Sequence, residues 1–158
     1  MYPLYSRAIA YLREEVLLSA IKVQKKLQLK KLCLKIWDAY RPFSVQEKMW
    51  QVYPDEKFLA KPIRSGNKLI SGSKHSRGAA LDVTIVDSNG HYLTMPSYFD
   101  EFSVKSHRKN PDCSLDAKKN MNLLEDIMKD HGFIPLPTEW WHFDWHNWKK
   151  FELIDFVF

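Results

Sequence analysis

Two histidines and one aspartate are the residues of this sequence best suited to bind a metal ion. His75 and Asp82 belong to the run Ser-Lys-His-Ser-Arg-Gly-Ala-Ala-Leu-Asp at 73–82, and His142 ends Glu-Trp-Trp-His at 139–142. Two imidazoles and one carboxylate are a common ligand set for catalytic zinc, which takes three protein ligands and keeps one position open for water. The three residue types therefore fit a catalytic zinc site.

Glu139 is the candidate general base because it stands three residues before His142. A carboxylate beside a metal-bound water can take the proton of that water. In a regular strand, side chains three positions apart point to opposite faces. We therefore expect Glu139 to lie in a bend that precedes the strand of His142.

Arg41 is the candidate for stabilising negative charge during the reaction. It is followed by Pro42 and preceded by Asp38, whose carboxylate can orient the guanidinium toward the oxyanion formed when water attacks a carbonyl. The same pair can instead serve only to stabilise a turn. Single histidines are also more often structural than ligating, so residue types alone leave both interpretations open.

The chain around the candidate ligands alternates as a half-buried strand does. Leu81, Val83 and Ile85 alternate with Asp82, so the carboxylate is expected to point away from the apolar face. Gly78 permits a turn that brings His75 back toward that strand.

The remaining elements are predicted from periodicity and from cap and turn residues. A long amphipathic helix is expected from an N-cap at Ser6 to Leu27, and a short helix from a Ser44 and Glu47 capping box to about Tyr53. The other expected elements are a strand at 32–37, loops at 38–42 and 61–78, a short return strand at 91–94, a lid-like irregular stretch to 114, a helix at 115–131 stopped by Gly132, and extended chain at 140–145.

This order predicts a small α+β fold, with a central antiparallel sheet flanked by helices and the metal site at the strand ends. The 158 residues, 45% of them hydrophobic and 27% charged, suit a single domain spanning 1–158. No internal repeat or linker-like change of composition divides the sequence.

The net charge of +5 raises the possibility of an acidic partner, but its distribution argues against nucleic acid. Six lysines alternate with apolar residues as on a solvated helix and strand face: Lys22, Lys25, Lys26, Lys30, Lys31 and Lys35. The two cysteines form no disulfide framework. Charged residues interrupt the N-terminal apolar positions, so we expect no membrane span and, as written, a cytoplasmic protein, or a periplasmic one if a signal has been removed.

Three ordered segments together resemble the zinc D-alanyl-D-alanine dipeptidases, the VanX-like branch of the zinc D,D-peptidase family. The run 73–82 is similar to the first metal motif of that family, S-x-H-x-x-G-x-A-x-D. Glu-Trp-Trp-His at 139–142 is similar to its second motif, and Trp-Asp-Ala-Tyr-Arg-Pro at 37–42 to its upstream arginine motif. The resemblance extends from the first helix to Trp145.

The resemblance implies a role for each matching residue. His75, Asp82 and His142 would bind one Zn²⁺ per chain, Glu139 would be the base and Arg41 would stabilise the transition state. Two further residues match positions that bind the substrate: Asp100, for the free ammonium, and Ser73, near the carboxylate.

The sequence also departs from the family pattern. Family dipeptidases carry further chain before the first helix, so we expect either a compact variant with a more open cleft or a trimmed N-terminus. Met95-Pro96-Ser97 replaces the Met-Gly-Thr type of sequence that is common before the Asp100 motif in the family.

We therefore expect zinc-dependent hydrolysis of D-Ala-D-Ala to two D-Ala, with a small D,D-dipeptide as the partner. One alternative is a D,D-carboxypeptidase or peptidoglycan endopeptidase that acts on longer stem peptides. An alternative of another class is a non-catalytic zinc-binding module, although structural zinc has no use for a base such as Glu139.

Overall fold

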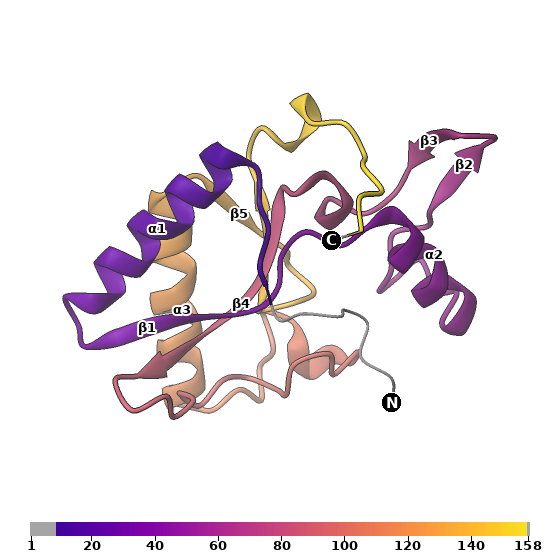
Figure 1. Cartoon of the computed structure of the whole chain (residues 1–158). Helices are drawn as coiled ribbons and strands as arrows, with labels where there is room; N and C mark the ends of the chain where they lie inside the picture. The colour runs from indigo at the N-terminus through magenta and orange to yellow at the C-terminus, as the bar shows by residue number, and fades with distance from the viewer. Residues whose placement is uncertain (1–8, 158) are drawn as a thin grey trace.

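The computed structural model describes residues 9–157, which form a four-stranded antiparallel sheet with helices and loops around it (Figure 1). The strand order is β1-β4-β6-β5, and a separate hairpin pairs β2 with β3. The elements are α1 (Glu14–Gln28), β1 (Leu32–Asp38), α2 (Phe43–Val52), β2 (Ile63–Ser65), β3 (Lys68–Ser71), β4 (Ala80–Asp87), α3 (Leu115–Asp130), β5 (Phe133–Pro135) and β6 (His142–Trp145), with single 3₁₀ turns at η1 (His75–Arg77), η2 (Val104–Ser106) and η3 (Trp148–Lys150). The predicted α+β class with an antiparallel sheet is confirmed.

The hydrophobic core lies between the sheet and the helices α1 and α3, which also contact each other. Apolar side chains recur in α1 at the helical period, and Leu81, Val83 and Ile85 of β4 are fully buried. Since side chains alternate along a strand, Asp82 and Thr84 of β4 lie on the opposite face. That second face of the sheet carries the candidate site.

The helix predicted from Ser6 begins later than expected, at Glu14, and Ser6 itself lies outside the described residues. Residues 9–13 belong to no helix or strand, and Arg13, the N-cap, has extended backbone. Backbone hydrogen bonds join Arg13 N to Gly78 O at 3.0 Å and Tyr40 N to Tyr11 O at 2.9 Å. If the helix began earlier, the N–H of Arg13 and the carbonyl of Tyr11 would form hydrogen bonds within it. In this structure both groups bond to distant loops instead.

The predicted capping box of α2 is also wrong, although the helix exists. Pro42 is the N-cap, without a side-chain cap. The N–H of Ser44 donates instead to Asp155 Oδ1 at 2.7 Å, and Glu47 pairs with Arg64 at 2.8 Å. A carboxylate from the C-terminal segment thus does the capping that a local residue was expected to do.

Two other expectations need adjustment. The predicted loop 61–78 contains the β2–β3 hairpin, and the expected return strand at 91–94 is reduced to one bridge between Val86 and Tyr92. The strand at 32–37 and the helix at 115–131 are present within one residue of their expected ends. None of the helices that the structure describes is long and apolar enough to cross a membrane.

Candidate active site

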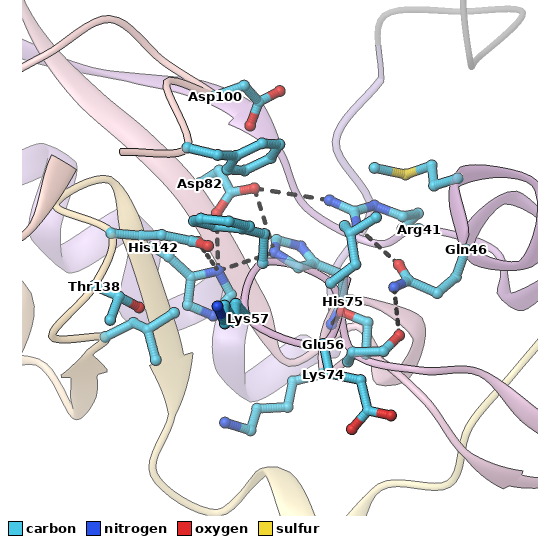
Figure 2. Close-up of a pocket in the computed structure, with 18 of the residues that line it drawn as sticks. Arg41, Gln46, Glu56, Lys57, Lys74, His75, Asp82, Asp100, Thr138 and His142 are labelled. Carbon is cyan, nitrogen blue, oxygen red and sulfur yellow. Dashed lines mark hydrogen bonds and ion pairs between the residues drawn. The ribbon is translucent and has the colours of Figure 1, made fainter. Parts of the chain in front are cut away.

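His75, Asp82 and His142 converge on the second face of the sheet, with one donor atom from each within 4.8 Å of the others (Figure 2). Asp82 of β4 and His142 of β6 are direct partners across antiparallel strands. His75 reaches them from η1, which ends at Gly78 in the left-handed conformation, φ +64°. Strand pairing and one glycine turn therefore bring together residues 67 positions apart.

Each imidazole is held by a hydrogen bond from the nitrogen that faces away from the site. The Nδ1 of His75 lies 2.7 Å from Ala39 O, and the Nε2 of His142 lies 2.9 Å from Asp144 Oδ1. Asp144 in turn pairs with Lys74 Nζ at 2.5 Å. Metal-binding histidines are almost always oriented in this way, because the outer hydrogen bond selects the tautomer whose free nitrogen faces the metal.

The inward donor atoms have spacings that suit a small metal ion. His142 Nδ1 lies 2.9 Å from Asp82 Oδ1, and His75 Nε2 lies 3.4 Å from Asp82 Oδ2 and 3.2 Å from His142 Nδ1. A tetrahedral zinc site with bonds of about 2.0–2.1 Å has ligand-to-ligand separations of about 3.3 Å. The three residues therefore fit a metal of this kind.

The carboxylate and the imidazoles of this cluster stabilise one another's charged forms. Burial opposes ionisation of Asp82, but the two imidazoles outweigh it and hold its pKa well below the usual range. Burial also opposes protonation of His142, yet hydrogen bonds to Asp144 and Asp82 raise its pKa to about 10. Asp82 is thus a carboxylate at neutral pH, and the cluster attracts positive charge, as a proton or as a metal ion.

Arg41 lies beside this cluster and is held on two sides. Its Nε and Nη2 donate to Asp38 Oδ2 at 2.9 and 2.6 Å, and its Nη1 donates to Gln46 Oε1 at 2.8 Å. The guanidinium of Arg41 also lies near Asp82, whose Oδ2 is 3.9 Å from Nη2. The Asp38–Arg41 pair thus holds the guanidinium near the metal-site residues.

Glu139 lies in the bend before β6, as its spacing from His142 required. Its Oε2 is 4.0 Å from His142 Nδ1, and only 8% of the residue is exposed. Burial is the main cause that raises the pKa of Glu139 to about 7, with His142 opposing the shift and Asp82 adding to it. A carboxylate that exchanges its proton near neutral pH suits general-base catalysis.

The cluster opens into a cavity of about 290 Å³ that Arg41 and Glu139 also line. Ser73 and Asp100 line the same cavity. The hydroxyl of Ser73 accepts a hydrogen bond from His75 N at 3.2 Å. Burial raises the pKa of Asp100 to about 6, so the group remains mainly ionised at pH 7. All eight predicted site residues are thus placed in or directly behind one cavity.

The segment 99–102 separates this cavity from a second, larger groove of about 840 Å³. Asp100 and Phe102 line the first cavity, whereas Phe99 and Glu101 line the second. Asp100 adopts the left-handed conformation, φ +57°, which is unusual for a residue other than glycine. Successive residues of this segment thus line opposite cavities, and this alternation places Asp100 of the expected lid-like stretch in the first one.

Sequence reasoning missed three residues that hold the site. Asp144 orients His142, Gln46 holds Arg41, and Arg108 Nη2 donates to His142 O at 3.1 Å. Asp144 stands two residues after His142 on the same face of β6, a spacing that was available in the sequence. His146, although it lies close to His142 in the sequence, places its Nδ1 3.0 Å from Gly132 O and is not part of the cluster.

Comparison with known proteins agrees with this geometry. A family model described as D-ala-D-ala dipeptidase matches residues 3–151. A D-alanyl-D-alanine dipeptidase of Escherichia coli is 36% identical over 141 residues, which cover 89% of this chain and 69% of that protein. The enzymes of the same name from Enterococcus faecium and Enterococcus faecalis are 30% and 32% identical, over 70% of this chain and 60% of each protein.

The matched region includes all three motifs and every residue of the candidate metal cluster. The chain nevertheless spans only about two thirds of the length of its relatives. Since the family model covers nearly all of the sequence, the chain belongs to the D-Ala-D-Ala dipeptidase family of metallopeptidases.

Proposed function

We propose that this chain hydrolyses the free dipeptide D-Ala-D-Ala to two molecules of D-Ala, with one zinc ion held by His75, Asp82 and His142. The observation that carries the proposal is the convergence of this cluster with Glu139 and Arg41 in one cavity, in a chain of this family. A purely structural zinc site would be closed by a fourth protein ligand. Among the described residues, the cluster offers three.

Zinc bound here would act as a Lewis acid on the peptide carbonyl and make water a better nucleophile near neutral pH. Glu139 accepts the proton of the attacking water as the new C–O bond forms. It then gives that proton to the departing amine as the C–N bond breaks, so that the carboxylate is regenerated. Its position 4.0 Å from His142 Nδ1 places it beside the metal site without making it a fourth ligand.

Arg41 stabilises the negative charge that develops on the carbonyl oxygen. Its hydrogen bonds to Asp38 and Gln46 hold the guanidinium in place before the substrate arrives. A donor that is already oriented costs no reorganisation during the reaction, which is why such groups have large effects on rate.

The two ends of the dipeptide require different partners. Asp100, ionised at pH 7, attracts the free ammonium group, and the Ser73 hydroxyl offers a hydrogen bond to the carboxylate. A site that recognises both ends across one short gap selects dipeptides over longer peptides.

The test is release of D-Ala by the zinc-loaded protein from three substrates: D-Ala-D-Ala, L-Ala-L-Ala and N-acetyl-D-Ala-D-Ala. We expect cleavage of the first alone, its loss with a chelator and its return with zinc. Cleavage of the acetylated peptide would instead indicate a carboxypeptidase. Zinc binding without cleavage of any of the three would favour a non-catalytic zinc module.

A further inference from the structure

Three basic side chains other than histidine line the cavity, and two of them are committed to carboxylates within the protein. Arg41 is bound by Asp38 at 2.6 Å, and Lys74 by Asp144 at 2.5 Å. The third is Lys57, whose ammonium group takes part in no ion pair with any residue in the described range 9–157. Lys57 therefore carries a positive charge that is available to a ligand in the cavity.

The backbone on both sides of Lys57 is held in place, although its side chain is exposed. Asp55 Oδ1 accepts a hydrogen bond from Lys57 N at 2.9 Å, and Asp55 O accepts two more, from Phe58 N and Leu59 N. Leu59 is buried, and the ring of Phe58 lies 4.9 Å from that of Phe102. The loop is thus built by an aspartate turn and packed at its tip.

The loop is also tied directly to Arg41. The side-chain amide of Gln46, which is fully buried, donates to Ala60 O at 2.8 Å and accepts from Arg41 Nη1 at 2.8 Å. Gln46 therefore connects Arg41 to Ala60, which lies three residues after Lys57 at the end of the same loop. Figure 2 shows Lys57 among the lining side chains, together with Arg41, Gln46 and the metal-site residues.

The charges in the cavity make this lysine important for a substrate with a free carboxylate. Three acidic side chains outside the metal cluster line the cavity, namely Glu56, Asp100 and Glu139. They attract an ammonium group but repel a carboxylate, and the Ser73 hydroxyl carries no charge to offset that repulsion. A lysine ammonium provides both a positive charge and up to three hydrogen-bond donors.

We propose that Lys57 binds the C-terminal carboxylate of the dipeptide and thereby makes the site selective for substrates with a free carboxyl end. The inference rests on the proposed dipeptidase function and deepens it. Lys57 is a specificity residue in this scheme, acting on substrate binding, while Glu139 and Arg41 act on the reaction itself.

The experiment compares two ligands that differ only at the carboxyl end, D-Ala-D-Ala and its C-terminal carboxamide. Their dissociation constants are measured by calorimetry with zinc-loaded Glu139→Gln protein, in which turnover is blocked, with and without Lys57→Gln. We expect Lys57→Gln to weaken binding of the acid about tenfold, the size of one charge-assisted hydrogen bond at a partly exposed site. Binding of the carboxamide should change less than about twofold.

Turnover provides the second measurement. In the otherwise unaltered enzyme, Lys57→Gln should raise KM for D-Ala-D-Ala about tenfold and leave kcat within about threefold, because the lost interaction is present equally in the ground and transition states. Lys57→Arg should restore most of the affinity. Lys61→Gln is the matched control, since Lys61 is an exposed lysine close by in the sequence that does not line the cavity.

The two proposals fail in different ways. Equal loss for acid and carboxamide, or no loss for either, overturns the role of Lys57 whether or not the dipeptide is cleaved. Carboxylate-selective binding that depends on Lys57, in a protein that cleaves no dipeptide, refutes the proposed hydrolysis and leaves the carboxylate site standing. A protein that neither binds nor cleaves D-Ala-D-Ala overturns both.

Discussion

The environment of Glu139 suits it to transfer a proton near neutral pH. Burial at 8% exposure disfavours its charged form, while the nearby imidazole of His142 favours it, and the pKa is raised to about 7. The bend before β6 turns the carboxylate toward the cavity, and the strand itself would have turned it away. Both the position of Glu139 and its raised pKa therefore suit a general base.

Glu139→Gln is expected to remove turnover while the metal cluster remains intact. Gln keeps the shape of the side chain but cannot accept a proton, and general-base catalysis typically contributes about 10²- to 10⁴-fold. The measurements are kcat/KM for D-Ala-D-Ala and the bound zinc per chain. A variant that binds zinc normally and keeps more than a tenth of the activity would show that another group is the base.

At the scale of elements, the site depends on a loop that is fastened to two distant segments. Gly78 ends η1 with φ +64°, and its carbonyl accepts from Arg13 N at 3.0 Å. A Cβ at this position would lie 3.3 Å from Arg13 N. Both backbone conformation and close packing therefore require glycine here.

Gly78→Ala is expected to destabilise the fold by more than the cost of the left-handed conformation alone, which is about 1–2 kcal/mol. It should also weaken zinc binding, because His75 precedes the turn by three residues. Gly66→Ala is the matched control, with φ +56° and nothing within 4 Å of the added Cβ. Urea unfolding and zinc titration of both variants measure the difference, and equal effects would remove the packing argument.

The C-terminal segment around Ile154 and Asp155 also holds the loop of the site in place. Ile154 N donates to Ser76 O at 2.9 Å, Ile154 O accepts from Phe43 N at 3.2 Å, and Asp155 accepts from Ser44 N and Arg64. The segment thereby joins η1, which holds His75, to the start of α2. It lies beyond the residues matched by the family model.

Asp155→Asn tests this fastening through its dependence on pH. Burial opposes ionisation of Asp155, but hydrogen bonds from Ser44 and Arg64 outweigh it and lower the pKa. The carboxylate therefore adds stability above the unfolded pKa of about 3.9, and this stability is lost as the pH falls through the folded value.

The expected loss in Asp155→Asn is about 0.5 kcal/mol at pH 7, after allowance for solvent screening, and it should vanish at low pH. Urea unfolding at several pH values measures it. Asp112→Asn, at an exposed position, is the control and should show no such trend. A loss that does not depend on pH would mean that the charge of Asp155 is irrelevant.

On the scale of the whole molecule, the candidate metal site joins two neighbouring elements, η1 and β4, to β6, whose His142 lies 60 positions after Asp82. His75 belongs to η1, Asp82 to β4 and His142 to β6, and the outer hydrogen bond of His75 extends the connection to Ala39 after β1. A metal that binds only the folded arrangement must stabilise all of it.

Zinc is therefore expected to raise the melting temperature. At a free concentration 100 times its Kd, a ligand adds about 2.7 kcal/mol, which corresponds to about 5–10 °C for a protein of this size. A chelator should reverse the shift. Asp82→Asn serves as the comparison: its own melting temperature should respond little to zinc, and an undiminished response would place the metal elsewhere.

Several parts of the fold were predictable because their signals are local. The alternation around Asp82 predicted β4, the apolar spacing at 115–131 predicted α3, and the spacing of Glu139 from His142 predicted the bend. The start of α1 and the cap of α2 were not, because Arg13 and Ser44 bond to residues more than sixty positions away.

By itself, the sequence determined the kinds of group available to the site and the order of the elements that carry them, since residue type and periodicity are local properties. Only the tertiary structure decided which nitrogen of each histidine faces inward, which carboxylate orients His142 and which lysine remains unpaired in the cavity. Those outcomes depend on burial and on hydrogen bonds between distant segments. Because desolvation and long-range contacts set both geometry and proton affinity, they arise only when the chain is folded.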